Sequence, residues 1–162
     1  MNILTGESSS DLFGGDVPPQ VKHLVDAART ATNPERALAL LWTAQVSAPD
    51  CPSLYYLLYK FYARHADFEQ AELAALKGLD VAADQAHLPD DWRTVTSSMG
   101  DFMSPGPARF WLFTLKALAF IRVRKRDPES ARAYLDKVQE LDPQGGTGAD
   151  VIESLIKGSQ ND

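Results

Sequence analysis

A pattern of paired helical segments returns along this chain after about 34 residues. Ala37 and Leu41 lie one helical turn apart, and Ala71 and Ala75 stand in the same relation at the next interval. An interval of this size is typical of helical arrays, in which each unit buries its apolar face against the next unit. Apolar residues follow the 3.6-residue helical period, and no sustained alternation predicts a strand. The pattern therefore predicts an all-α fold.

The first helices of three copies also align. The corresponding positions are Val21, Leu24, Val25 and Ala28, then Tyr55, Leu58, Tyr59 and Tyr62, then Leu115, Leu118, Ala119 and Arg122. The third copy follows the second after a longer interval, so an insertion of about 26 residues separates them. We expect repeats at about 18–51, 52–85 and 112–145, with the insertion at about 86–111. We expect residues 17–158 to form a single domain between a flexible leader, 1–16, and a tail, 159–162.

Capping residues and prolines mark the expected helix starts. Asn33-Pro34 and Asp127-Pro128 each combine a capping side chain with a proline suited to the first turn. Asp67 with Gln70 predicts a capping box, and Thr147 with Asp150 predicts the start of a last helix that ends at Gly158. The expected helices begin near 18 and 34 and then cover 53–66, 67–85, 107–126, 128–141 and 148–157. The last is expected to cover the end of the array with one apolar face that holds Val151, Ile152, Leu155 and Ile156.

The second copy carries a recognisable motif. Tyr55, Leu58 and Tyr62, followed by Phe68 and Ala71, resemble the tetratricopeptide repeat (TPR). The pattern of that family is aromatic-x2-Leu-small-x2-aromatic, then Ala-x3-aromatic, then Pro, over 34 residues. The departures from the family pattern are Val25, Tyr59, Arg122 and Ala83. The resemblance covers about two thirds of the chain. It implies a TPR-like solenoid of antiparallel helix pairs with a C-terminal capping helix.

In the TPR family the first helix of each repeat lines a concave surface. The resemblance therefore implies a partner-binding groove formed by Lys22, Arg29, Tyr56, Lys60, Arg64, Lys116, Phe120 and Arg124. A basic groove with aromatic side chains suits an extended protein segment that carries acidic and apolar residues. The alternative is that Tyr56 and Phe120 only pack against the insertion. In the insertion, Trp92 and Phe102 are possible contact residues that fold into the groove, bind a partner, or pack structurally on the long second-repeat helix.

These features predict a protein-binding module: a small adaptor, scaffold or chaperone-like factor. A first alternative is an accessory or regulatory subunit of an enzyme complex whose groove is occluded by its own insertion. A second is a relative of the chaperones of bacterial type III secretion, although their repeats are contiguous and these are interrupted. The four cations Arg122, Arg124, Lys125 and Arg126 either complement a helix C-terminus or bind phosphate or an acidic partner.

Nothing in the sequence predicts catalysis, a cofactor or a metal. His23, His65 and His87 are far apart, and Gly145-Gly146-Thr147-Gly148 follows a helix instead of a strand. Cys51 is the single cysteine, which excludes an internal disulfide and fits a reducing cytoplasm. The net charge of −6 argues against nucleic acid and anionic membranes as partners. We expect a cytoplasmic monomer or weak homodimer.

Overall fold

The computed structural model describes residues 17–161, and the predicted all-α class is confirmed for this range. The α-helices are α2 (Pro19–Thr30), α3 (Pro34–Ser47), α4 (Pro52–Arg64), α5 (Phe68–Ala86), α6 (Pro107–Arg124), α7 (Pro128–Leu141) and α8 (Ala149–Gln160). Two short 3-10 helices, Trp92–Thr94 and Ser97–Met99, lie in the segment between α5 and α6. The expected leader, 1–16, lies outside the described residues.

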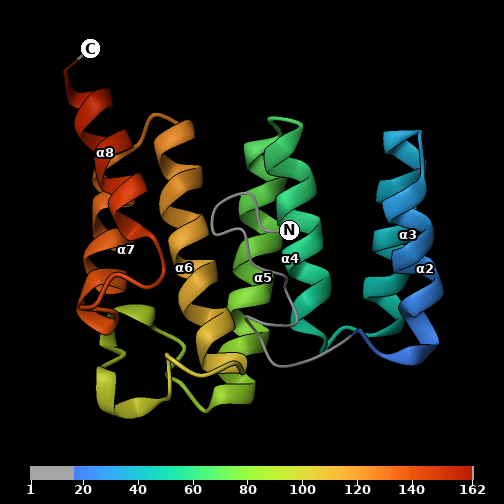
Figure 1. The fold of residues 1–162 in the computed structure, drawn as a ribbon, viewed down its shortest axis with the longest axis horizontal. Coiled ribbons are helices and arrows are strands. Elements are labelled where there is room, and N and C mark those ends of the chain that lie inside the picture. The colour runs from blue at the N-terminus through green and yellow to red at the C-terminus, as the bar shows by residue number, and fades with distance from the viewer. Residues whose placement is uncertain (1–16, 162) are drawn as a thin grey trace.

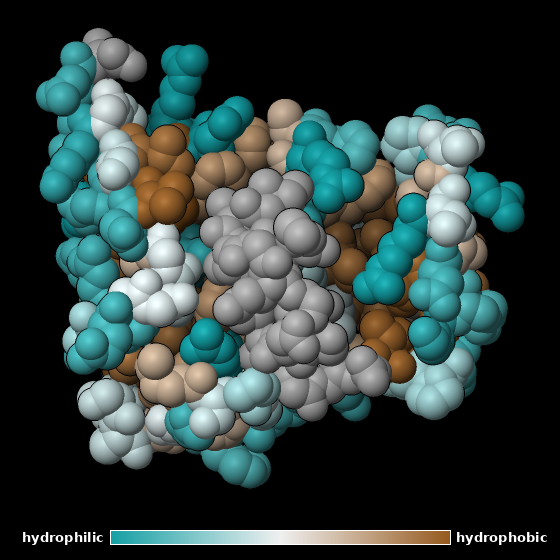
Figure 2. Space-filling view, in the orientation of Figure 1, coloured by the Kyte–Doolittle hydropathy of each residue, from teal (hydrophilic) through white to brown (hydrophobic). Residues whose placement is uncertain are grey.

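Neighbouring helices pack side by side in chain order, from α2 and α3 at one edge to α7 and α8 at the other (Figure 1). In addition, α4 contacts α6 and α6 contacts α8. The segment between α5 and α6 lies at one end of the row, beneath α6 and α7 in this view. In the same orientation, hydrophilic side chains cover most of both lateral edges, and apolar surface is visible between them (Figure 2).

The predicted caps at Asn33, Asp67 and Asp127 are present, but the capping box at Asp67 is incomplete, because the Asp67 backbone N–H donates to the Tyr62 carbonyl at 2.9 Å and not to the Gln70 side chain. The Asn33 side chain accepts hydrogen bonds from the backbone N–H groups of Glu35 and Arg36, at 2.8 and 3.4 Å. The Asp67 and Asp127 carboxylates each accept one from the N–H three residues on, at 3.2 and 3.1 Å. Such a cap stabilises a helix by about 1 kcal/mol, because it satisfies a donor that the helix leaves unpaired.

The predicted cap of the last helix is wrong. Gly148 occupies the cap position of α8 without a side-chain hydrogen bond, and the helix continues past Gly158 to Gln160. Thr147 is buried, and its backbone N–H donates to the Asp142 carboxylate at 2.7 Å. The reason is that the loop between α7 and α8 turns inward, where the Thr147 carbonyl accepts a hydrogen bond from Lys116.

Helix α6 forms the centre of the larger hydrophobic core. Every residue from Trp111 to Ala119 is buried, including Thr114 and Lys116. A helix that is apolar on all sides has to be surrounded by others, and α6 contacts α4, α5, α7 and α8. A second, smaller cluster joins α2, α3 and α4 through Val21, Val25, Ala44 and Leu54.

Small residues allow the helices of each pair to approach closely. Ala37, Ala71 and Ala131 are all buried, as their equivalent positions in the sequence pattern predict. Gly78 marks the tightest approach, because a Cβ atom placed there would lie 2.8 Å from the Cβ of Tyr55 on α4. A side chain at position 78 would therefore push α4 and α5 apart.

The end helix α8 buries a narrower face than predicted. Ile152 and Ile156 are buried, whereas Val151 and Leu155 are 53% and 41% exposed. Residues one helical turn apart share a face, and positions 151 and 155 are rotated from that face by about 100°. The expectation that all four residues cover the array is therefore wrong for Val151 and Leu155.

The cation-rich end of α6 has a specific partner on α5. Glu72 is buried, and its carboxylate pairs with Arg122 and with Lys125 Nζ, the latter at 2.6 Å. Arg122 also pairs with Asp127, at 3.2 Å. The sequence analysis interpreted these cations as a complement to a helix C-terminus and did not predict the contact of Arg122 and Lys125 with Glu72. Hydrogen bonds from Glu72 and Glu69 raise the pKa of Lys125, so its charge is held in place.

Candidate binding cavity

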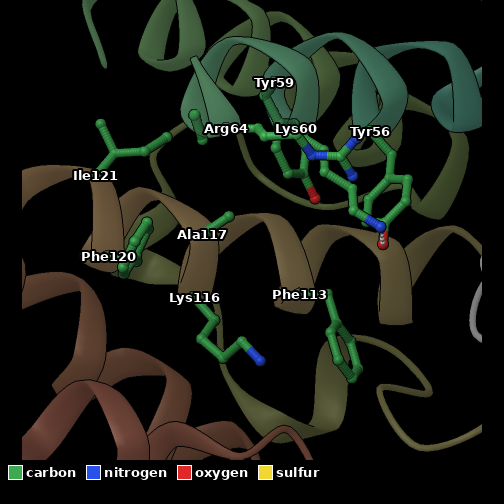
Figure 3. A pocket seen from close by; sticks show the side chains of 10 residues that line it. Tyr56, Tyr59, Lys60, Arg64, Phe113, Lys116, Ala117, Phe120 and Ile121 are labelled. Atoms are coloured by element: carbon green, nitrogen blue, oxygen red, sulfur yellow. Dashed lines mark hydrogen bonds between the residues drawn. The ribbon is translucent and has the colours of Figure 1, made fainter. Parts of the chain in front are cut away.

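A cavity of about 190 Å³ lies between α4 and α6 (Figure 3). The residues from α4 that line it are Tyr56, Tyr59, Lys60, Ala63 and Arg64. The residues from α6 are Phe113, Lys116, Ala117, Phe120 and Ile121. The lining is thus mainly aromatic and aliphatic, with three cationic side chains.

Helical periodicity explains why these residues meet. Tyr56, Lys60 and Ala63 follow one another at spacings of three and four along α4, and Phe113, Lys116 and Phe120 do the same along α6. Such spacing places side chains on one helix face. Ala63 and Ala117 contribute only a methyl group each, which leaves space between the larger side chains.

Positive charge gathers at the α4 side of the cavity. Lys60 Nζ lies 3.4 Å from the Tyr56 hydroxyl oxygen and 5.3 Å from the centroid of the same ring. Burial lowers the pKa of Lys60, and the neighbouring cations Arg64 and Arg29 lower it further. Burial also raises the pKa of Tyr56 to about 12, so the phenol is neutral at physiological pH. A cluster of like charges of this kind favours the approach of an anionic group.

Lys116 lines the cavity but is buried, so its expected place as an exposed groove cation is wrong. Its ammonium group donates to the Thr147 carbonyl at 2.5 Å and lies 5.0 Å from the Phe113 ring centroid. Figure 3 shows the side chain leaving α6 on the side opposite to Lys60. A buried ammonium needs an acceptor, and the loop between α7 and α8 supplies it. Tyr56 is also buried instead of exposed.

Five of the eight predicted groove residues line the cavity: Tyr56, Lys60, Arg64, Lys116 and Phe120. Lys22 and Arg29 do not; both are exposed on α2, where each pairs with Asp26 at 3.6 and 3.8 Å. Arg124 lies 5.1 Å from the ring centroid of Phe68, outside the cavity lining.

The other five lining residues, Tyr59, Ala63, Phe113, Ala117 and Ile121, are outside that predicted set of eight. Phe113 lies three residues before Lys116 on α6 and shares its helix face. A search along the helix face in both directions from Lys116 would have found it.

The insertion does not line the cavity. Trp92 stacks on Tyr134 of α7, with ring centroids 4.7 Å apart, and Phe102 packs on Trp111 of α6 at 5.9 Å. Lys137 of α7 donates to the Val95 carbonyl at 2.9 Å. These contacts attach the insertion to α6 and α7, and the residues that line the cavity come from α4 and α6.

Within residues 17–161, no cluster of three or more His, Cys, Asp or Glu side chains is arranged to hold a metal ion. Over the same range, no helix is long and apolar enough to cross a membrane. Cys51 is half-buried, and burial raises the pKa of its thiol, which lowers its reactivity as a nucleophile.

Comparison with known proteins gives a relative that matches almost the whole chain. The chain is 27% identical over 159 residues to an uncharacterized 19.8 kDa protein in the nifW 5' region of Azotobacter chroococcum mcd 1, and the match covers 96% of this chain and 89% of that protein. No family model matches the sequence, and no solved structure matches it. The name of this relative gives the position of its gene beside nifW and states no activity.

Proposed function

We propose that this chain is a TPR-like protein-binding module, a small cytoplasmic adaptor, scaffold or chaperone-like factor. It holds a protein segment whose apolar anchor enters the cavity between α4 and α6 and whose acidic residues face Lys60 and Arg64. The observation that carries the proposal is the cavity itself, which combines aromatic walls with cations from α4.

The size of the cavity limits the anchor to one large apolar side chain. An apolar cavity of about 150 Å³ is enough to hold a benzene molecule. The cavity of about 190 Å³ therefore suits a Phe or Leu side chain, flanked by Phe113 and Phe120. Acidic residues next to that anchor would gain charge-assisted contacts with Lys60 and Arg64.

The TPR-like assignment is supported by the correspondence between pairs. The helices α2 and α3, α4 and α5, and α6 and α7 form three successive pairs in contact. Ala37, Ala71 and Ala131 occupy the same place in the second helix of each pair, and all are buried. Helix α8 contacts α7 and α6, as a capping helix would.

The alternative of an enzyme-complex subunit occluded by its own insertion is less well supported. It requires Trp92 or Phe102 to lie over the groove. Instead, their aromatic partners are Tyr134 and Trp111.

The proposal is tested by photo-crosslinking in the cells from which the sequence derives. A photoreactive phenylalanine analogue replaces Phe120 in the cavity or, as a control, Leu73, which is 53% exposed on α5. We expect protein adducts from position 120 that are lost in the double variant Lys60→Glu/Arg64→Glu, with a Tm that changes by only a few degrees. The variant Arg36→Glu/Arg126→Glu makes the same change in net charge at exposed positions and should keep the adducts. Adducts that persist in the cavity variant, or that are absent from position 120, would refute the proposal.

A further inference from the structure

We propose that the chain's own segment 7–16 occupies the cavity when no partner is bound, with Leu12 or Phe13 as the apolar anchor. This inference rests on the proposed function, because it assigns to the chain's own residues the chemistry expected of a partner. The segment would then compete with partners for the same site.

The composition of the segment matches the cavity. Leu12-Phe13 is an apolar pair in a stretch of Ser and Gly, and it is flanked by Asp11 and Asp16. Glu7 adds a third acidic residue, and residues 1–16 contain no Lys or Arg. The segment is thus an acidic sequence with one central apolar anchor.

The cavity presents the complementary groups. Phe113 and Phe120 are apolar walls, and Lys60 and Arg64 are cations on α4. Arg29 on the neighbouring helix α2 is near enough to lower the pKa of Lys60. Lys60 and Arg64 in the lining, with the nearby charge of Arg29, therefore give this part of the molecule a positive potential that attracts an acidic segment.

The start of the described chain lies within reach of the cavity. Val17 packs against the cluster that contains Val21 of α2 and Leu54 of α4. Along α4, Leu54 and Lys60 are separated by about 9 Å, at about 1.5 Å per helical residue. Phe13 precedes Val17 by four residues, which span up to about 13 Å when extended. The intervening Gly14-Gly15 lets the chain change direction without steric cost.

Attachment in the same chain gives the segment an advantage over a free ligand. A short tether gives an effective concentration in the mM range, so even a weak contact is populated. A partner then has to displace the segment, and its apparent affinity falls by the fraction of molecules whose cavity is open. Removing the anchor should therefore strengthen the binding of a ligand supplied in solution.

Disulfide trapping in the full chain tests the placement. Cys51 is replaced by Ser, and Gly14→Cys is combined with Ala63→Cys in the cavity or with Ala133→Cys, an exposed control position on α7. Under mild oxidation we expect an intramolecular disulfide to form at least tenfold faster for the 14–63 pair than for the 14–133 pair. Adding Leu12→Ser/Phe13→Ser should remove the difference. Equal rates for the two pairs, with the anchor intact, would overturn the inference.

A binding experiment tests the competition. The probe is a fluorescein-labelled peptide of residues 6–16, titrated with the full-length protein. We expect Leu12→Ser/Phe13→Ser to bind the probe at least tenfold more tightly than the unmodified chain, and the further change Lys60→Glu/Arg64→Glu to abolish binding. The same affinity for the unmodified and anchor-free chains would overturn the inference.

The two proposals fail separately. A fast 14–63 disulfide without partner adducts at position 120 would support the occupied cavity and refute the partner-binding function. Partner adducts without preferential 14–63 crosslinking would support the function and refute the occupancy by segment 7–16.

Discussion

The pair α2–α3 and the body α4–α8 are both built from helices packed side by side, but they differ in how many buried residues stabilise them. The body is built around α6, whose buried face extends around the whole helix and includes Trp111 and Leu118. The pair contributes fewer residues: Val21, Val25 and Ala44 share a small cluster with Leu54 of α4, and Ala28 and Leu41 belong to the larger core. Because fewer buried contacts hold the pair, we infer that it opens at a lower free energy than the body.

Polar contacts make up part of the junction between the two regions. The Trp42 indole N–H donates to the Tyr62 hydroxyl at 2.8 Å, and the Gln45 amide donates to the Tyr55 hydroxyl at 3.0 Å. The Tyr55 hydroxyl in turn donates to the Pro49 carbonyl at 2.7 Å. Directional contacts of this kind hold α3 in register on α4, but each contributes only about 1 kcal/mol. Since Arg29 on α2 acts on Lys60, opening of the pair would also change the charge beside the cavity.

The largest loss of stability is expected when a large buried side chain of the body is truncated. We predict that Trp111→Ala lowers the free energy of unfolding by about 3–5 kcal/mol, because it removes a fully buried aromatic side chain from the centre of the core. Urea denaturation followed by circular dichroism measures the change. Trp92→Ala removes a half-buried indole that stacks on Tyr134, and should cost less. A larger loss for Trp92→Ala would mean that the insertion, and not α6, holds the body together.

A smaller and more local effect is expected in the pair. We predict that Val25→Ala costs about 2 kcal/mol, the value of about two buried methyl groups and the space that they leave. Hydrogen exchange should show faster opening of α2 and α3 amides and little change in α6. Val46→Ala, at a position 75% exposed on α3, is the matched control and should change neither. Uniformly faster exchange through α6 would show that the two regions open as one unit.

Local signals allowed most of the fold to be predicted from the sequence. Asn33, Asp67 and Asp127 are caps that act on backbone groups within three residues, so the sequence nearby contains the whole interaction. The resemblance to the TPR pattern implied Tyr56, Lys60 and Arg64 as groove residues, and all three line the cavity. Both kinds of signal depend on neighbours along the chain.

The features that sequence reasoning missed depend on distant residues. The burial of Lys116 follows from the Thr147 carbonyl, 31 positions away, and the burial of Glu72 from Arg122, 50 positions away. The spacing of residues along a helix indicates which side chains share a face. It does not indicate which distant loop or helix packs against that face. The same limit explains Val151 and Leu155, whose exposure depends on how α8 is rotated against α7.

The polar junction should contribute less than either core. We predict that Trp42→Phe weakens the pair by about 1 kcal/mol, because it removes the donor to Tyr62 while it keeps an aromatic ring. Hydrogen exchange of α3 amides measures the local change. Tyr62→Phe removes the acceptor instead, and the double variant should cost no more than the larger single change. Additive losses would show that the two side chains act independently.

The smallest effect is expected at the other edge, where Arg132 on α7 holds Glu153 on α8. The two guanidinium nitrogens lie 2.5 and 3.0 Å from the carboxylate oxygens, and this contact lowers the pKa of Glu153 below its ordinary value of 4.5. A carboxylate with a lower pKa in the folded state stabilises the fold above the unfolded pKa, and this contribution is lost as the pH falls through the folded pKa. Since the pair is partly exposed, we expect less than about 1 kcal/mol. Glu153→Gln does not titrate, so its loss of stability between pH 7 and pH 3 should be smaller than that of the unmodified chain. Urea denaturation at both pH values measures the difference. An equal loss in the two proteins would mean that the Arg132–Glu153 pair does not stabilise the edge formed by α8, which then depends on buried apolar residues such as Ile152 and Ile156.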